Sequence, residues 1–329
     1  MDTAVEELIS YARDEISLRR EQGCDTWEWE RLVALFKQDP GPNPLKRARS
    51  LVRSIQSLTP DEDFPYEEPN ALDKIRALRP EGPRMIATGL SPQALDAATR
   101  GAWLGHVAGC MLGKPVRHWH RVKIDGLMRV CELEELSDYI PPTPNGRGFD
   151  FPPAVQNQLR GQITRVVADV GLDFSVLSLR VLEHYGDEFE TENVARCWTR
   201  NLAYGRVSRA ARAAYRNLVN SLEPPQTALE MNPFREQIGA MNRGCAWGWA
   251  LPGRPERAAE LAWRDARLSH ERNGLYAAMW AAAATSAAFA ALSAERTVEV
   301  GLSEVPRKSR LADVIGRVQA AHEEGKSAG

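Results

Sequence analysis

Residues 101–117 read GAWLGHVAGCMLGKPVR, and this stretch decides the fold class. Small residues return at every fourth position (Gly101, Gly105, Gly109), which places them on one face of a helix. Because glycine has no Cβ atom, another backbone or a ligand phosphate can approach that face closely. The pair Ser91-Pro92 predicts the helix start, and Gly113-Lys114-Pro115 predicts its end.

Helical patterns continue on both sides of this stretch, and no convincing period-2 alternation predicts a strand. Apolar residues from Val5 to Ile16 repeat at helical spacing behind a capping Asp2 or Thr3. Towards the C-terminus we predict helices over Pro255–His270 and Asn273–Ser293, and a last apolar stripe from Leu311 to His322. The alanine-rich second of these can approach its neighbours closely, so we expect it to be buried in a bundle. The predicted fold class is therefore all-α.

Proline marks the domain organisation. Residues 39–92 are rich in proline and read as an arm that holds short helices at 44–57 and 70–78. A second Pro/Gly-rich loop spans 140–156. We predict an N-terminal helical extension with a proline-rich arm over residues 1–90, followed by one compact helical domain over residues 91–329.

The composition is that of an ordinary globular protein, and it limits the classes of partner. The formal net charge is −2, without the basic excess of a dedicated nucleic-acid binder, so no nucleic-acid partner is predicted. No apolar run is long enough to span a bilayer, and the acidic N-terminus does not read as a signal peptide. Five widely spaced cysteines without a C-x-x-C pair indicate free thiols in a reducing cytoplasm.

Two further stretches carry a family resemblance together with residues 101–117. The first is DVGLDFSVL, residues 169–177. The second runs from Tyr215 to Tyr276 and contains NPFRE at 232–236 and SHERNG at 269–274. Over roughly residues 90 to 315, the chain resembles the ADP-ribosylglycohydrolase family, and in particular one bacterial branch of it.

The resemblance implies an all-α fold and an ancestral ribosyl pocket. Members of the family cleave the N- or O-glycosidic bond between ADP-ribose, or a related ribosyl group, and its acceptor. Typical members use two magnesium ions that clustered carboxylates hold. The resemblance also implies a glutamate that assists catalysis, directly after the Pro-Val of the first signature. It further implies a final acidic motif that completes the metal site.

Most of these acids are replaced in this chain. Arg117 stands at the position of the glutamate, and Cys110 at that of the first aspartate. In the acidic block Asp169 persists, but Val170 and Gly171 follow it. Cys245 stands at another position where the resemblance implies an acidic residue. The final acidic motif does not follow Arg310, so the C-terminus looks short. We therefore expect no metal site and no cofactor.

The remaining polar residues define a candidate site. Asp169, Asp173 and His270 are the candidate catalytic residues, because carboxylates and a near-neutral imidazole can transfer protons. Candidate ligand-binding residues are small, hydroxyl-bearing, amide or cationic side chains: Gly109, Lys114, Ser175, Asn232, Arg235, Ser269 and Asn273. A structural role is an open alternative for each of them. Trp247, Trp249, Trp263 and Trp280 read as core residues or as walls of an aromatic pocket.

Three hypotheses follow. The chain is a repurposed metal-independent enzyme, for instance of bacterial specialised metabolism, that acts on a ribosyl- or nucleotide-like small molecule. Alternatively it is an inactive binding or regulatory subunit that pairs with a second copy or another chain at its short C-terminal end. The third hypothesis is a magnesium-dependent hydrolase that a partner completes. The retained polar motif from Ser269 to Gly274 favours the first.

Overall fold

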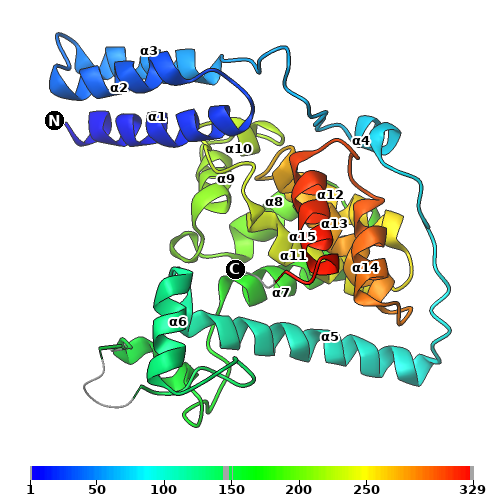
Figure 1. The fold of residues 1–329 in the computed structure, drawn as a ribbon. Helices are drawn as coiled ribbons and strands as arrows, with labels where there is room; N and C mark the ends of the chain where they lie inside the picture. Colours follow the sequence, from blue (N-terminus) through cyan, green and yellow to red (C-terminus); the bar gives the residue numbers. More distant parts are fainter. Residues whose placement is uncertain (1, 144–147, 150, 327–329) are drawn as a thin grey trace. The chain divides into compact units, whose positions relative to one another are not determined.

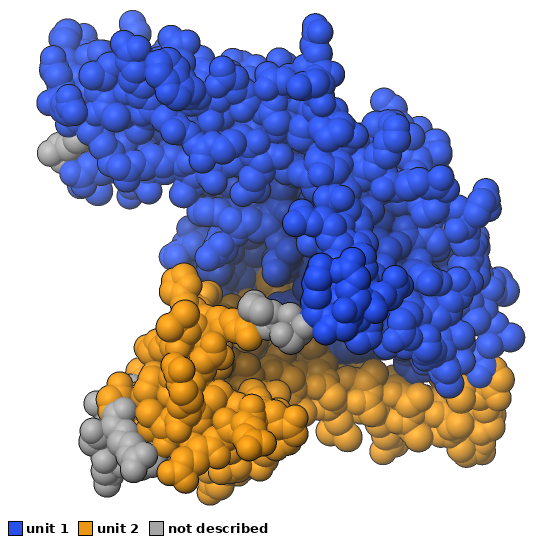
Figure 2. All heavy atoms as spheres, viewed as in Figure 1, with its two compact units in different colours: residues 1–88, 177–329 blue, residues 89–176 orange. Residues whose placement is uncertain are grey.

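The computed structural model describes residues 2–143, 148–149 and 151–326, and in these residues every regular element is a helix (Figure 1). The contacts divide the chain into two compact units. Unit 1 consists of residues 1–88 and 177–329, and unit 2 of residues 89–176 (Figure 2). The predicted all-α class is confirmed. The predicted boundary near residue 90 lies at one limit of unit 2, whereas the second limit falls inside a helix.

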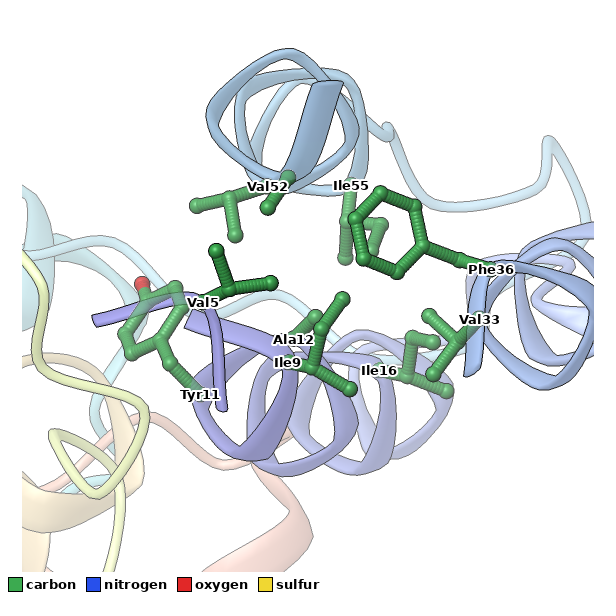
Figure 3. Close-up of a cluster of buried hydrophobic side chains, with 10 residues drawn as sticks. Val5, Ile9, Tyr11, Ala12, Ile16, Val33, Phe36, Val52 and Ile55 are labelled. Atoms are coloured by element: carbon green, nitrogen blue, oxygen red, sulfur yellow. The ribbon is translucent and has the colours of Figure 1, made fainter. Parts of the chain in front are cut away.

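Three helices at the N-terminus form a small bundle within unit 1. They are α1 (Thr3–Glu21), α2 (Trp27–Gln38) and α3 (Pro44–Gln56). As predicted, Asp2 caps α1, since its side chain accepts a hydrogen bond from the Ala4 amide at 3.2 Å. Apolar residues of all three helices meet in one cluster (Figure 3), which includes Ile9, Phe36 and Ile55. Burial of this cluster holds the three helices together.

The proline-rich arm follows the bundle and is fixed to the rest of unit 1. Its short helix α4 (Leu72–Leu78) lies within the predicted segment 70–78. Just after α4, the Arg79 side chain is paired with Glu304 at 2.5 Å and with Glu256 at 2.6 Å. Arg84 adds a third ion pair, to Glu304 at 2.8 Å. The arm is therefore held at several points and does not simply trail along the surface.

The remaining helices of unit 1 include the alanine-rich helix, against which four others pack, namely the two before it and the two after it in the chain. The bounds of the remaining helices are α7 (Val170–Tyr185, which begins in unit 2), α8 (Thr191–Asn201), α9 (Arg209–Val219), α10 (Gln226–Leu229), α11 (Met241–Ala250), α12 (Pro255–Ala266), α13 (Asn273–Ala288), α14 (Ala294–Leu302) and α15 (Arg310–Glu323). Short 3₁₀ segments lie at Gly186–Glu188, Tyr204–Arg206 and Ile238–Ala240. None of the described helices is long and apolar enough to cross a membrane.

Helix α13 is buried along almost its whole length, as its alanine content predicts. Helix α11 packs directly on it through two glycines. A Cβ atom at Gly244 would lie 2.5 Å from the Ala278 carbonyl oxygen, and one at Gly248 would lie 2.5 Å from that of Ala282. No larger residue fits at these two positions, because the two backbones are nearly in contact.

Two predicted helix ends were wrong. Helix α12 ends at Ala266, not at His270, and α13 ends at Ala288, not at Ser293. Ser293 instead begins α14, because its side chain accepts a hydrogen bond from the Arg296 amide at 3.2 Å. After α12, the carbonyl oxygens of Leu268 and Ser269 accept hydrogen bonds from the side chains of Thr227 and Asn232. These tertiary bonds satisfy carbonyl groups that lie beyond the end of the helix.

Unit 2 contains α5 (Pro92–Gly113), the 3₁₀ segments η1 (Lys114–Val116) and η2 (Pro153–Gln158), and α6 (Arg121–Val130). Ser91 caps α5 as predicted, since its hydroxyl accepts from the Ala94 amide at 3.2 Å. A small core contains Leu127, Ile140, Phe151 and Leu159. The proline- and glycine-rich loop predicted over 140–156 is described only in part, because residues 144–147 and 150 lie outside the described residues.

Candidate functional site

The ten predicted site residues are distributed over both units. Unit 2 holds Gly109, Lys114, Asp169, Asp173 and Ser175, and unit 1 holds Asn232, Arg235, Ser269, His270 and Asn273.

Asp169 lies between two cations at the N-terminus of α7. The Lys114 ammonium donates a hydrogen bond to Asp169 Oδ2 at 3.0 Å, and Arg117 Nη1 lies 3.8 Å from the same oxygen. The other oxygen, Oδ1, accepts a hydrogen bond from the Gly171 amide at 2.8 Å. Lys114 also donates to the Ala168 carbonyl at 2.5 Å. Asp169 thus caps α7 and neutralises one of two adjacent positive charges.

These contacts fix the charge of Asp169. Its partial burial acts to raise the pKa of the carboxyl, but the Gly171 amide, Lys114 and Arg117 outweigh burial and hold that pKa below its ordinary range. The thiol of Cys110 behaves in the opposite way. Burial and the nearby Asp169 raise the pKa of Cys110 despite the two cations, so the thiol stays protonated at neutral pH.

An imidazole that the sequence analysis did not select lies beside this cluster. His106 Nε2 is 3.2 Å from the Ser175 hydroxyl and 4.0 Å from the Cys110 sulfur. Ser175 is fully buried, whereas His106 and Cys110 are partly exposed. The spacing of four residues between His106 and Cys110 puts both on one helix face, and it is the signal that could have identified the histidine. The imidazole can accept or donate a proton here.

The other two predicted residues of unit 2 are Gly109 and Asp173. Within the described part of unit 2, a Cβ atom built on Gly109 would meet no other atom within 4 Å. The same holds for Gly101 and Gly105, so the glycine face of α5 is open within its own unit. Asp173 is half-buried in the first turn of α7, where a carboxylate is favourable near the helix N-terminus.

The donor set of unit 2 does not fit the magnesium pair that the resemblance implies. The surviving aspartate is already paired with an ammonium and a guanidinium. Cys110, whose thiol stays protonated, stands where the resemblance implies an aspartate. Hard cations such as magnesium prefer several oxygen ligands. In the described residues, no group of three or more His, Cys, Asp and Glu side chains has an arrangement that could hold a metal.

In unit 1, Ser269 and His270 belong to a buried chain of polar groups. Arg243 Nε lies 2.5 Å from Asp265 Oδ2, and Arg243 Nη2 donates to the Ser269 hydroxyl at 2.9 Å. The Ser269 oxygen lies 2.8 Å from Nδ1 of His270. His270 is only 2% exposed, and burial, followed by the charge of Arg243, lowers its pKa well below 6.5. The imidazole is therefore neutral at physiological pH.

Asn232 and Arg235 are also engaged in structural contacts. The Asn232 amide donates to the carbonyls of Ala228 and Ser269 at 2.8 and 2.9 Å. Arg235 forms a two-pronged ion pair with Glu15 of α1, with both N–O distances at 2.8 Å. Its Nε lies 2.5 Å from Glu271. Arg235 thus fixes the N-terminal bundle to the rest of unit 1, and its role in ligand binding remains a prediction.

Asn273 takes part in a second buried network. Its amide donates to Glu236 at 3.2 Å, and its carbonyl oxygen accepts from the Leu311 amide at 2.9 Å. Arg272 and Arg310 both pair with Glu236 and with Glu68 of the arm. The motif from Ser269 to Gly274 is therefore rich in polar contacts that join the arm, α13 and α15.

The residues expected to be core or pocket walls divide between these roles. Trp247 is fully buried and stacks on Phe189 with ring centroids 4.8 Å apart. Cys245 is partly buried, and burial raises its pKa to about 11. Trp263 in contrast is half-buried and lines a cleft of about 460 Å³. Trp263 therefore matches the prediction of a pocket wall, and Trp247 matches that of a core residue.

The comparisons with known proteins agree with this picture. The family model for ADP-ribosylglycohydrolase matches residues 91–328. None of the curated proteins and none of the solved structures matches the chain. The match covers most of the chain, including the signature helix α5, the start of α7 and the polar motif before α13. The chain therefore belongs to the ADP-ribosylglycohydrolase family.

Proposed function

We propose that this chain is a metal-independent enzyme on the ADP-ribosylglycohydrolase fold that acts on a ribosyl- or nucleotide-like small molecule. The observation that carries the proposal is the position of Asp169 between Lys114 and Arg117. In this reading the two side-chain cations supply the positive charge that magnesium supplies in typical members of the family. Two cations and one carboxylate leave a net positive charge for an anionic ligand group.

The chemistry of the two cations suits a phosphate-bearing ligand. An ammonium and a guanidinium both donate charge-assisted hydrogen bonds to phosphate oxygens and hydroxyl groups. Arg117 is half-exposed, with 49% of its side chain accessible, so it can reach a ligand in solvent. Neither cation can generate a nucleophilic water as a bound metal ion does. A reaction at this site therefore needs a separate group that transfers a proton.

His106 is the residue that we assign to this proton transfer. Its ring lies next to the hydroxyl of Ser175, and its partial exposure leaves it open to a ligand or to water. Ser175 is buried and so acts as a positioning residue for the ring. Asp173, one helical turn after Asp169, is the second candidate proton carrier. Hydrolysis of a glycosidic bond by these groups would be general acid–base catalysis without a metal ion.

Turnover of ADP-ribose conjugates in excess EDTA tests the proposal. Arginine- and serine-linked ADP-ribosyl peptides are incubated with the protein, and released ADP-ribose is measured by chromatography. We expect release in EDTA, and a loss of at least about tenfold in kcat/KM for Lys114→Met, which removes a charge-assisted hydrogen bond. Arg100→Met is the matched control, because Arg100 lies on α5, the helix that ends directly before Lys114, and its side chain is 76% exposed. Release that requires magnesium would contradict the proposal.

A second candidate function is a non-catalytic ligand-binding or regulatory subunit. The observation that favours it is the state of the predicted catalytic residues. Asp169 is already paired with Lys114, and His270 is buried, neutral and bonded to Ser269. Saturable binding of ADP-ribose that Lys114→Met weakens, without turnover of any conjugate and without an effect of His106→Gln, would support this second function over the first.

A further inference from the structure

A cleft in unit 1 lies where the arm meets the helices of the family domain. Its volume is about 460 Å³, within the range of sites for small molecules. The walls come from the start of α4, from α10, from α12 and from the beginning of α13. The lining residues are Asn70, Ala71, Leu72, Asp73, Pro225, Ala228, Leu229, Trp263, Arg267, His270, Glu271 and Leu275. All of them belong to unit 1, and the proposed enzyme function uses none of them.

One wall of the cleft is an arginine stacked on a tryptophan. The Arg267 guanidinium carbon lies 4.4 Å from the centre of the Trp263 ring. In the part of the chain that the structure describes, no carboxylate lies within 4.0 Å of this guanidinium, and no residue accepts a hydrogen bond from it. Arg264 of the same helix is paired with Glu260 at 2.8 Å. Arg267 thus presents a cation with free donors at a half-buried position.

Of the two carboxylates that line the cleft, one is neutralised and the other is exposed to solvent. Glu271 is neutralised, because Arg235 lies 2.5 Å from one of its oxygens and the Asn70 amide donates to the other at 3.3 Å. Asp73 is exposed in the first turn of α4. The apolar part of the lining includes Leu72, Leu229 and Leu275. The cleft therefore combines an apolar slot, an aromatic face and one free cation.

The rim is held in place before any ligand binds. The Trp263 indole donates to the Asn70 carbonyl at 2.9 Å, and the Asn70 side chain accepts from the Arg272 amide at 2.7 Å. Tyr276 donates to the neighbouring Pro69 carbonyl at 2.5 Å. Because the arm is fixed by these bonds, binding would not require an additional loss of backbone entropy.

We propose that this cleft binds a flat aromatic small molecule that carries one carboxylate or phosphate, with Arg267 as the anion-binding group. The aromatic part lies in the apolar slot beside Trp263, and the anion takes a two-pronged hydrogen bond from the guanidinium. Arginine suits this role because its planar fork matches both carboxylate and phosphate. The site is built from the arm together with the family domain, so the arm has a function beyond packing.

Calorimetric titration with three probes tests the proposal. The probes are 1-naphthoate, 1-naphthyl phosphate and the neutral 1-naphthamide. We expect at least one of the two anions to bind about tenfold more tightly than the amide, as one charge-assisted pair provides. The better of the two anions identifies the ligand class. The absence of saturable binding of both anions would overturn the proposal.

Variants locate the binding site. Arg267→Met should remove the preference for the anion while the amide still binds, and Leu229→Trp should fill the cleft and weaken all probes. Arg254→Met is the matched control, because Arg254 is exposed at the opposite end of the same helix and lies outside the cleft. Equal anion affinity for Arg267→Met and the unaltered chain would contradict the proposal, and so would an equal loss for Arg254→Met. Circular dichroism establishes that each variant is folded.

Discussion

Two ion pairs of similar chemistry lie in very different surroundings in the two units. The Arg243–Asp265 pair of unit 1 is closed to solvent, with side chains 1% and 3% exposed. The Lys114–Asp169 pair of unit 2 is partly open, with 19% and 12%, and the adjacent Arg117 is half-exposed. The charges of the first pair are enclosed by the protein, whereas those of the second are in part accessible to solvent. Burial therefore separates residues that hold the fold from residues that can carry chemistry.

The largest effect on the free energy of unfolding is expected from breaking the buried Arg243–Asp265 pair. Arg243→Met leaves the carboxylate of Asp265 buried without its cation and removes the donor to Ser269. We expect a loss of about 3–5 kcal/mol in the free energy of unfolding, measured by denaturant titration. Arg296→Ala is the control, because Arg296 and its partner Glu299 are both more than half-exposed, and it should cost less than about 1 kcal/mol. Equal losses in the two variants would show that burial does not distinguish these pairs.

Because His270 is neutral in the folded chain, the free energy of unfolding should depend on pH. Its pKa in the folded chain is lowered well below 6.5, so the unfolded chain binds a proton below pH 6.5 while the folded chain does not. Stability should therefore fall as pH falls below 6.5, by at most about 1.4 kcal/mol per pH unit from this group.

Denaturant titrations between pH 5 and pH 8 measure this slope. His270→Asn should reduce it, and His322→Gln should leave it unchanged because His322 is exposed. Glu15 and Glu68, whose pKa values are lowered from 4.5, act at lower pH. Burial raises the pKa values of Glu236 and Asp265, and these carboxyls act with the opposite sign, so the difference in slope between His270→Asn and the unaltered chain reports the imidazole. An unchanged slope in His270→Asn would refute the assignment of a neutral buried imidazole.

The smallest effect on stability is expected at the open pair. Lys114→Met removes one contact of Asp169, but the Gly171 amide and Arg117 remain. We expect a loss of about 1 kcal/mol or less in the free energy of unfolding. The pKa of Asp169 should rise, because the variant lacks the positive charge of Lys114 that lowers it. Carbon NMR titration of the labelled carboxyl group measures this shift. A fall in the pKa would mean that Lys114 does not stabilise the carboxylate.

The elements of the fold were largely predictable because they depend on local chemistry. The caps at Asp2 and Ser91, and the burial of the alanine-rich helix α13, follow from residue types at fixed spacing. The ends of α12 and α13 were not predicted. After α13 a local feature was missed, because the Ser293 hydroxyl caps the next helix, α14. After α12, the carbonyl oxygens of Leu268 and Ser269 accept hydrogen bonds from Thr227 and Asn232, which are distant in sequence.

The candidate site was predictable in composition but not in contacts. In the sequence, Lys114 and Asp169 were separate candidates and Arg117 was the replacement of a glutamate, and the structure brings these three side chains together. The ion pair between Arg235 and Glu15 joins residues 220 positions apart, so no local pattern announces it. His106 was missed because a single histidine within a glycine-spaced helix carries little weight until its neighbours are known.

Direct calorimetric titration of the protein with magnesium chloride tests the central claim that side-chain cations take the place of metal ions. The account predicts no saturable heat up to millimolar magnesium, and no change when ADP-ribose is present. Micromolar binding of one or two magnesium ions per chain, with or without ADP-ribose, would contradict it.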